Sequence, residues 1–146
     1  MEHTHSKALV VEKPIRINAY DIDVMGIVSN TVYVRWFEDL RFALLDEYFP
    51  VEPLLEQNIS PILSNTHVAY KEPLIFFDKP IGRAWLSGLG KIKWEVTLEI
   101  IVNGKICCKG LQDGAFFDLQ RKRPIKTPTK LMEIYQSATG LTAVKL

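Results

Sequence analysis

Two carboxylates lie close together near the start of the chain, within residues 20–30, which read Tyr-Asp-Ile-Asp-Val-Met-Gly-Ile-Val-Ser-Asn. Asp21 and Asp23 follow an alternating apolar pattern, and Gly26 is typical of a turn because glycine adopts positive φ without strain. Asn30 stands where a long helix could begin, since its side chain can accept a hydrogen bond from a first-turn amide. The unpaired N–H groups and partial positive charge of a helix start attract anions and developing oxyanions. A carboxylate beside such a start can polarise water or attack a carbonyl, which is the chemistry of activated acyl hydrolysis.

The same stretch has a simpler interpretation, in which both aspartates are solvated turn residues. Aspartate is common in turns because its side chain hydrogen-bonds to nearby backbone. The residues taken alone favour this turn over a catalytic site. A catalytic interpretation therefore needs support from elsewhere in the sequence.

The other side chains with reactive chemistry are a histidine and two cysteines. His67 lies on a predicted strand and its imidazole suits proton transfer, although a hydrogen-bonded structural histidine is the favoured interpretation. Cys107 and Cys108 are adjacent, and neighbours on a strand point to opposite faces, so we expect no disulfide between them. Neither has an evident base that would make it a nucleophile. No Cys or His spacing indicates a metal site, and we expect no metal and no cofactor.

Length and charge limit the classes of protein further. A chain of 146 residues predicts a single domain, 1–146, with residues 1–8 a flexible polar start. Its 18 Lys and Arg against 17 Asp and Glu leave a formal net charge of +1, which argues against binding nucleic acid. No apolar run is long enough for a membrane span, and the N-terminal stretch lacks the apolar core of a signal peptide. Together with reduced cysteines, these features predict a cytoplasmic protein.

One long helix and a set of strands must position the acidic stretch. Residues 30–48 contain no Gly or Pro, and apolar side chains cover most of the circumference of the helix that they predict. Pro50 and Pro53 are expected to end it. Over 92–102 apolar and polar residues alternate almost perfectly, and the Asn-Gly pair that follows is a strong hairpin signal. The other predicted elements are strands at 15–20, 62–70, 81–89 and 105–119, and a short helix near 129–137.

The arrangement of these elements follows from what the strands can pack against. Long antiparallel strands must bury one face. The 30–48 helix is the only large apolar partner in the chain, so the strands are expected to curl around it. The prediction is an α+β architecture, a curled antiparallel sheet wrapped around one long central helix, which describes the hotdog fold.

A family resemblance begins in the acidic stretch and continues into the helix. Residues 23–33, together with the Trp-Phe-Glu-Asp-Leu-Arg run at 36–41, resemble the signature of hotdog acyl-CoA thioesterases related to 4-hydroxybenzoyl-CoA thioesterase. That signature is an aspartate, two variable positions, a glycine, a short segment with Asn or His, and then Tyr, an aromatic pair and Arg. Residues 70–73, 77–78 and 123–128 fit later family segments more loosely, so that the likeness spans 13–135.

The resemblance implies which residues carry out catalysis. Asp23, three positions before Gly26, is implied to be the catalytic carboxylate, acting as a general base or as a nucleophile. The backbone N–H of Asn30 is implied to hold the thioester oxygen. Tyr33 and Trp36 would line the acyl pocket or simply pack in the core, since aromatics at helical spacing usually pack. The implied oxyanion and substrate-binding residues are Gly26, Ile27, Val28, Asn30 and Tyr33.

The resemblance also bears on partners. Coenzyme A would arrive as part of the substrate, and the cluster Arg121, Lys122 and Arg123 either clamps its phosphates or forms a solvated turn, two interpretations of equal weight. Asp21 would order the loop rather than react. The family implies a homodimer or homotetramer with sites at the dimer interface, and exposed sheet edges need such cover.

The sequence as a whole therefore predicts an acyl-CoA thioester hydrolase. The alternatives are an acyl carrier protein thioesterase and a non-catalytic acyl-CoA-binding protein of the same fold. A hotdog dehydratase is less favoured because no His-plus-acid site suited to that chemistry is evident. Met25, Ser29 and Asn30 stand where many family members have other residues, which leaves the acyl group open.

Overall fold

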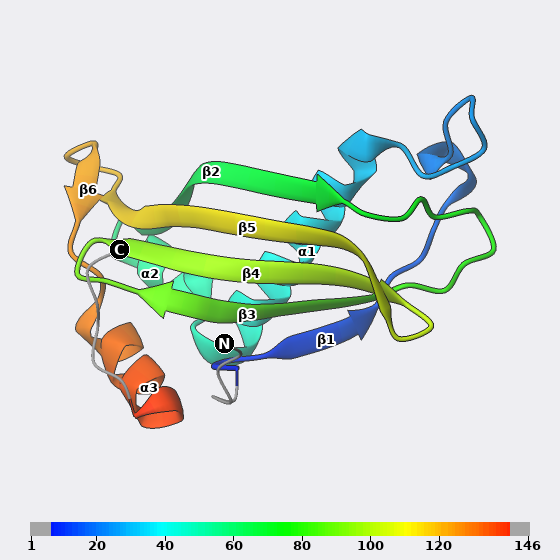
Figure 1. The fold of residues 1–146 in the computed structure, drawn as a ribbon. Helices are drawn as coiled ribbons and strands as arrows, with labels where there is room; N and C mark the ends of the chain where they lie inside the picture. Colours follow the sequence, from blue (N-terminus) through cyan, green and yellow to red (C-terminus); the bar gives the residue numbers. More distant parts are fainter. Residues whose placement is uncertain (1–6, 141–146) are drawn as a thin grey trace.

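A single curled sheet and one long helix dominate the computed structural model, which describes residues 7–140 (Figure 1). The described strands form an antiparallel sheet in the order β1-β3-β4-β5-β2, and the short β6 pairs with β5 beyond this path. The strands are β1 (Val11–Pro14), β2 (Ile59–Tyr70), β3 (Ile81–Leu89), β4 (Lys93–Val102), β5 (Lys105–Asp118) and β6 (Arg123–Ile125). The helices are a 3-10 turn η1 (Ala19–Asp21), α1 (Asn30–Tyr48), α2 (Val51–Glu56) and α3 (Thr129–Thr139).

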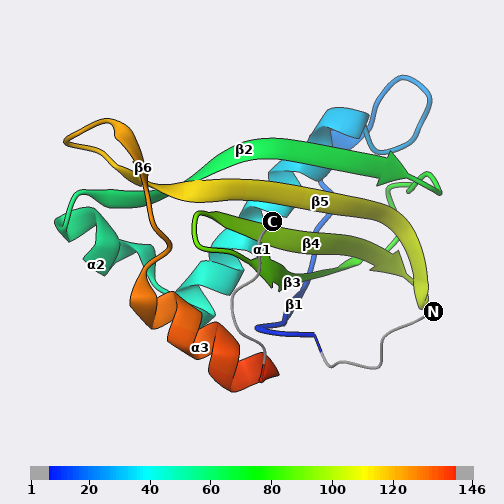
Figure 2. The same cartoon turned by 60° about the vertical axis from the view of Figure 1, so that its left-hand side comes forward.

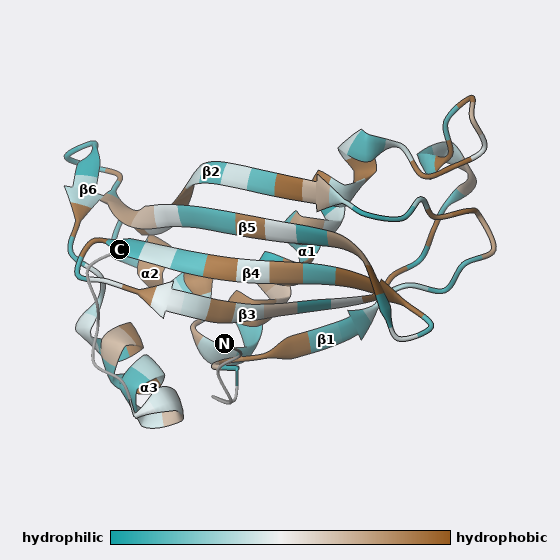
Figure 3. Cartoon of the chain, viewed as in Figure 1, coloured by the Kyte–Doolittle hydropathy of each residue, from teal (hydrophilic) through white to brown (hydrophobic). Residues whose placement is uncertain are grey.

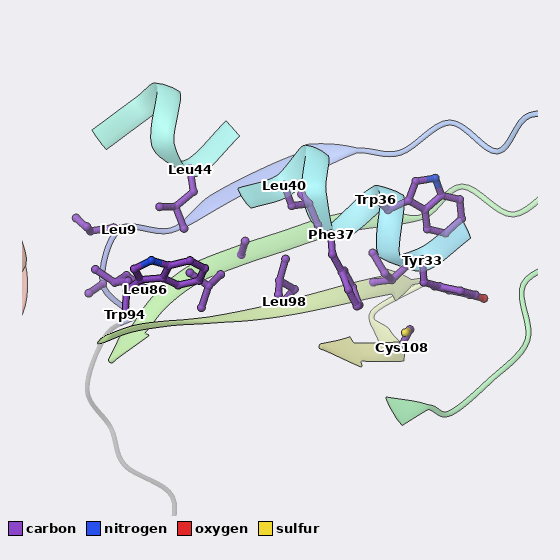
Figure 4. Close-up of a cluster of buried hydrophobic side chains, with 14 of the residues drawn as sticks. Leu9, Tyr33, Trp36, Phe37, Leu40, Leu44, Leu86, Trp94, Leu98 and Cys108 are labelled. Carbon is purple, nitrogen blue, oxygen red and sulfur yellow. The ribbon is translucent and has the colours of Figure 1, made fainter. Parts of the chain in front are cut away.

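Helix α1 crosses one face of the sheet, and its buried side chains recur at the three- and four-residue spacing of an apolar helix face. Phe37 and Leu40 on α1 and Leu98 on β4 are fully shielded from solvent, and Figure 4 shows them between helix and strands. Apolar and polar residues alternate along the strands (Figure 3), as expected when one sheet face meets a helix. This is the predicted hotdog fold.

Close approach of α1 to the sheet depends on a glycine. A Cβ placed at Gly110 on β5 would lie 2.5 Å from the ring of Phe37, so that any larger residue there would push the ring away. The Phe37 ring therefore packs directly against the backbone at Gly110, and this contact sets the distance between α1 and the sheet.

Two local predictions were wrong in part. The strand expected at 15–20 lies earlier, at β1, because the Asp21 carboxylate accepts the Asn18 N–H at 2.8 Å and turns the chain out of the sheet. Pro50 ends α1 but α2 follows at once and contains Pro53, which is tolerated in a first helical turn.

The chain start differs in part from the flexible stretch expected for residues 1–8. Ala8 is buried, and its carbonyl accepts the Leu86 N–H at 3.0 Å, so this residue is fixed against β3. Residues 1–6, with His3 and His5, lie outside the described part of the chain. Within residues 7–140, no helix combines the length and hydropathy needed to cross a bilayer.

Candidate active site

A tight hairpin-like loop connects η1 to α1 and projects from one end of the molecule (Figure 1). An isolated bridge between Ile22 and Val28 closes it. Inside the loop, the Asp23 N–H donates to Ile27 O at 2.8 Å and the Gly26 N–H donates to Asp23 O at 3.0 Å. Gly26 has φ +79°, which explains the need for glycine at this turn. The loop is therefore a defined structure that holds Asp23 in a fixed place.

The Asp23 carboxylate is exposed, with its two oxygens in different environments. Its Oδ1 accepts the Met25 N–H at 2.8 Å and, more weakly, the Ile27 N–H at 3.4 Å. Its Oδ2 accepts no hydrogen bond from any residue between 7 and 140, and so remains open to water or substrate. Asp23 therefore forms the expected turn through Oδ1, while Oδ2 is left without a hydrogen bond in the described part of the chain.

The first turn of α1 lies directly after this loop. Ser29, rather than Asn30, occupies the N-cap position, and its N–H donates to Asp21 O at 2.9 Å. The N–H groups of Asn30 and Thr31 find no acceptor in the described part of the chain, and no side chain there caps the helix. Two free donors at the positive end of α1 could hold a developing oxyanion.

The loop amides of the predicted oxyanion set are already engaged. Gly26 N–H binds Asp23 O, Ile27 N–H points to Asp23 Oδ1, and Val28 N–H donates to Leu74 O at 2.9 Å. These three residues shape the loop, and their amides already have acceptors in the described chain. Among the expected amide donors, that of Asn30 is the free one.

Asp21 has the loop-ordering role expected of it. It is only 4% exposed, its carboxylate accepts the Asn18 N–H, and its carbonyl accepts the Ser29 N–H. Both ends of the loop are thereby fastened at the entrance to α1.

A second wall of the site comes from the end of β2 and the loop that follows it. The Tyr70 hydroxyl donates to Asn30 O at 2.9 Å, and Leu74 O receives the Val28 N–H. Sequence reasoning gave Tyr70 no functional role, because only the folded chain shows that it reaches α1. Large exposed apolar side chains belong to η1 and to both loops at this end, namely Tyr20, Val24, Met25, Ile75, Phe76 and Phe77.

Tyr33 and Trp36 pack in the core, which is one of the two roles considered for them from the sequence. Tyr33 is 3% exposed and makes edge-to-face contacts with Trp36 at 5.1 Å and with Tyr70 at 5.3 Å between ring centroids. Burial, with a smaller contribution from Cys108 beside it (Figure 4), raises the pKa of Tyr33 to about 12. Its place inside the core leaves no open surface on Tyr33 for an acyl group in the single chain.

The cysteines and the histidine do not join the Asp23 site. Burial raises the pKa of Cys108 to about 12 and also raises that of Cys107, so both thiols stay protonated and poorly nucleophilic near neutral pH. His67 pairs in register with Leu111 and lies in a groove that also includes Trp85, on the sheet face away from α1. In the described chain, no three His, Cys, Asp or Glu side chains form a group that could hold a metal.

The basic cluster and the Asp23 loop lie at opposite ends of the sheet. Arg121 and Lys122 lie in the turn between β5 and β6 and Arg123 begins β6, whereas the Asp23 loop lies at the end of the molecule where β5 begins (Figure 1). The 14 residues of β5 separate these ends by roughly 45 Å along the strand. Within one chain the cluster therefore lies at the far end of β5 from the Asp23 loop.

The fold is the hotdog fold. The family model of the thioesterase-like superfamily matches residues 17–134, and the chain belongs to that family. It is 22% identical over 127 residues to the long-chain acyl-CoA thioesterase FadM of Escherichia coli, covering 84% of this chain and 95% of FadM.

Two further likenesses come from a curated sequence and a solved structure. A putative esterase of Aquifex aeolicus is 33% identical over 64 residues, 43% of this chain, and the match spans half the length of that esterase. The structure of the DHNA-CoA thioesterase of Staphylococcus aureus superposes with a TM-score of 0.80 at 19% identity, covering 88% of this chain and 89% of that one. At this identity the superposition shows the shared fold.

Proposed function

We propose that this protein hydrolyses acyl-CoA thioesters. The observation that carries the proposal is the Asp23 carboxylate, which is exposed, fixed through Oδ1 and unbonded at Oδ2, on a loop fastened to the start of α1. The superfamily to which the chain belongs supports the reaction, and the name of FadM supports acyl-CoA as the substrate class.

In the proposed mechanism, Asp23 activates water and the start of α1 stabilises the oxyanion. Asp23 Oδ2 takes a proton from a water molecule as that water attacks the thioester carbonyl. The free N–H groups of Asn30 and Thr31 stabilise the oxyanion that forms, and collapse of the intermediate expels the coenzyme A thiolate, which recovers the proton from Asp23. Direct attack by the carboxylate, giving a mixed anhydride that water then hydrolyses, uses the same geometry.

A panel of acyl-CoA substrates, with release of coenzyme A followed by a thiol-reactive dye, tests this proposal. The panel includes long aliphatic and hydroxylated aromatic acyl groups, because thioesterases for both classes are among the similar proteins. We expect turnover of at least one substrate. Tight binding without thiol release would instead indicate an acyl-CoA-binding protein. Faster thiol release from acyl carrier protein substrates with the same acyl group would instead indicate an acyl carrier protein thioesterase.

We further propose that the active unit is a homodimer, or a tetramer of two dimers, with sites at the dimer interface. β2 supports this, because it is a 12-residue strand at the edge of the sheet with β5 as its partner in the described chain. An exposed edge of this length needs cover. Since β2 ends at Tyr70, pairing along it places the Asp23 end near the second copy. Light scattering should give a mass at least twice 16.7 kDa, and a monomer alone would contradict the dimer.

A further inference from the structure

Tyr70 makes a contact with α1 that the proposed mechanism has not used. Its hydroxyl donates to the carbonyl oxygen of Asn30 at 2.9 Å, linking the end of an edge strand to the first residue of the helix. The two residues lie 40 positions apart in the chain. The bond therefore depends on the assembled fold and not on the local sequence.

The fold holds the Tyr70 hydroxyl in place from two sides. On the backbone side, Tyr70 pairs with Cys108, and the next two N–H groups, those of Lys71 and Glu72, both donate to Cys107 O at 2.9 and 3.0 Å. On the side-chain side, the Tyr70 ring packs edge-to-face with the buried Tyr33 ring. A hydroxyl anchored in this way restricts the peptide group that it binds.

The bound peptide group is the one that carries a free donor. The carbonyl of Asn30 and the N–H of Thr31 belong to one planar peptide unit, so fixing the oxygen also fixes the direction of that N–H. A hydrogen bond to the carbonyl also polarises the unit and makes its N–H a stronger donor. That N–H has no acceptor among residues 7–140.

We propose that Tyr70 is a positioning residue, whose hydroxyl orients and polarises the Asn30–Thr31 peptide so that the Thr31 N–H binds the oxyanion of the transition state. This inference rests on the proposed thioester hydrolysis. Tyr70 acts through the peptide and does not touch the substrate. Burial raises the pKa of the Tyr70 hydroxyl, so it stays protonated and able to donate across the neutral range.

Tyr48 provides a matched control at the other end of the same helix. Its hydroxyl donates to a backbone carbonyl, Val10 O, at 2.7 Å, and the phenylalanine variant would lose the same kind of bond. Tyr48→Phe and Tyr70→Phe should therefore lower Tm by similar amounts. They should differ in catalysis, because only Tyr70 binds the peptide of the free donor.

The experiment compares kcat and KM of both variants with the unchanged protein, on the best substrate of the acyl-CoA panel. Deleting an oxyanion donor costs about 10²–10³ in kcat, and weakening one should cost about 3- to 10-fold. We expect Tyr70→Phe to show that fall in kcat with KM nearly unchanged, and Tyr48→Phe to keep both constants. Equal kcat in the two variants, or a Tyr70→Phe loss confined to KM, would overturn the positioning role.

The Asp23→Asn variant separates failure of this inference from failure of the proposed function. If Asp23→Asn is inactive while Tyr70→Phe matches Tyr48→Phe, the hydrolase assignment stands and only the role of Tyr70 falls. If Asp23→Asn keeps full activity, or no substrate is turned over, the proposed site fails and the inference fails with it.

Discussion

Replacing Asp23 with asparagine is expected to lower kcat for acyl-CoA hydrolysis about 10²–10⁴-fold, the usual contribution of a general base. Asparagine has the same shape, and its Oδ1 can still accept the Met25 and Ile27 N–H groups. It places an NH₂ group where Oδ2 stands, and this group cannot take a proton from water. Activity on the best acyl-CoA substrate, measured with enzyme concentrations matched, tests the expectation.

The fold should survive this substitution, which makes the kinetic result interpretable. Asp23 is exposed and its loop bonds are retained, so the free energy of unfolding should change by no more than about 0.5 kcal/mol, as measured by thermal unfolding. Asp21→Asn is the matched control, since it changes a neighbouring but buried carboxylate that orders the loop. It should lower Tm more than Asp23→Asn and reduce kcat less. More than half of the normal rate in Asp23→Asn would remove Asp23 from the mechanism.

Elements with strong local signals were predictable from the sequence. The helix over residues 30–48 has both predicted boundaries, because an uninterrupted apolar face lies between the acidic turn and Pro50. β3 and the turn after β4 are also correct, and Asn103 and Gly104 adopt the positive φ values of 50° and 78° that made this pair a hairpin signal. In these cases the conformation of a segment depends mainly on its own residues.

Contacts between distant segments were not predictable, and they complete the site. Nothing local in the sequence indicates that the hydroxyl of Tyr70 meets Asn30, or that Arg41 donates to Gln112 Oε1 at 2.7 Å inside the core. The second of these gives Arg41, a residue of the family signature, a structural partner on β5, and burial lowers the pKa of its guanidinium. Both contacts depend on which strands pair with which.

The position of the basic cluster, residues 121–123, also depends on strand pairing and was not predictable from the local sequence. Arginine and lysine at residues 121–123 suit phosphate binding, but the direction of β5 determines at which end of the sheet these residues lie. The Asp118 carboxylate accepts the N–H groups of Gln120 and Arg121 at 2.9 and 3.0 Å, which builds a turn there. These bonds, with the positive charges of the turn, lower the pKa of Asp118. The Asp118 carboxylate therefore shapes the turn that carries Arg121 and Lys122.

The largest effect on stability is expected at Phe37, the side chain that seats α1 on the sheet. Its ring is fully buried and occupies space above Gly110 that a side chain at position 110 would fill. Phe37→Ala should lower the free energy of unfolding by about 3–5 kcal/mol, through lost burial and the cavity left behind. Since domains are typically stable by about 5–15 kcal/mol, the variant should remain folded but with a much lower denaturant midpoint.

A second substitution shows whether this loss arises from the Phe37–Gly110 fit. In the unchanged protein, Gly110→Ala should destabilise by about 1–3 kcal/mol, because the added Cβ meets the ring at 2.5 Å. In the Phe37→Ala background the ring is gone, and the same Cβ fills part of the cavity and restricts the unfolded chain, so the change should be neutral or stabilising by about 0.4–1 kcal/mol. Denaturant unfolding of the four proteins gives the coupling directly. Simple additivity of the two substitutions would show that α1 is not held at its depth by this contact.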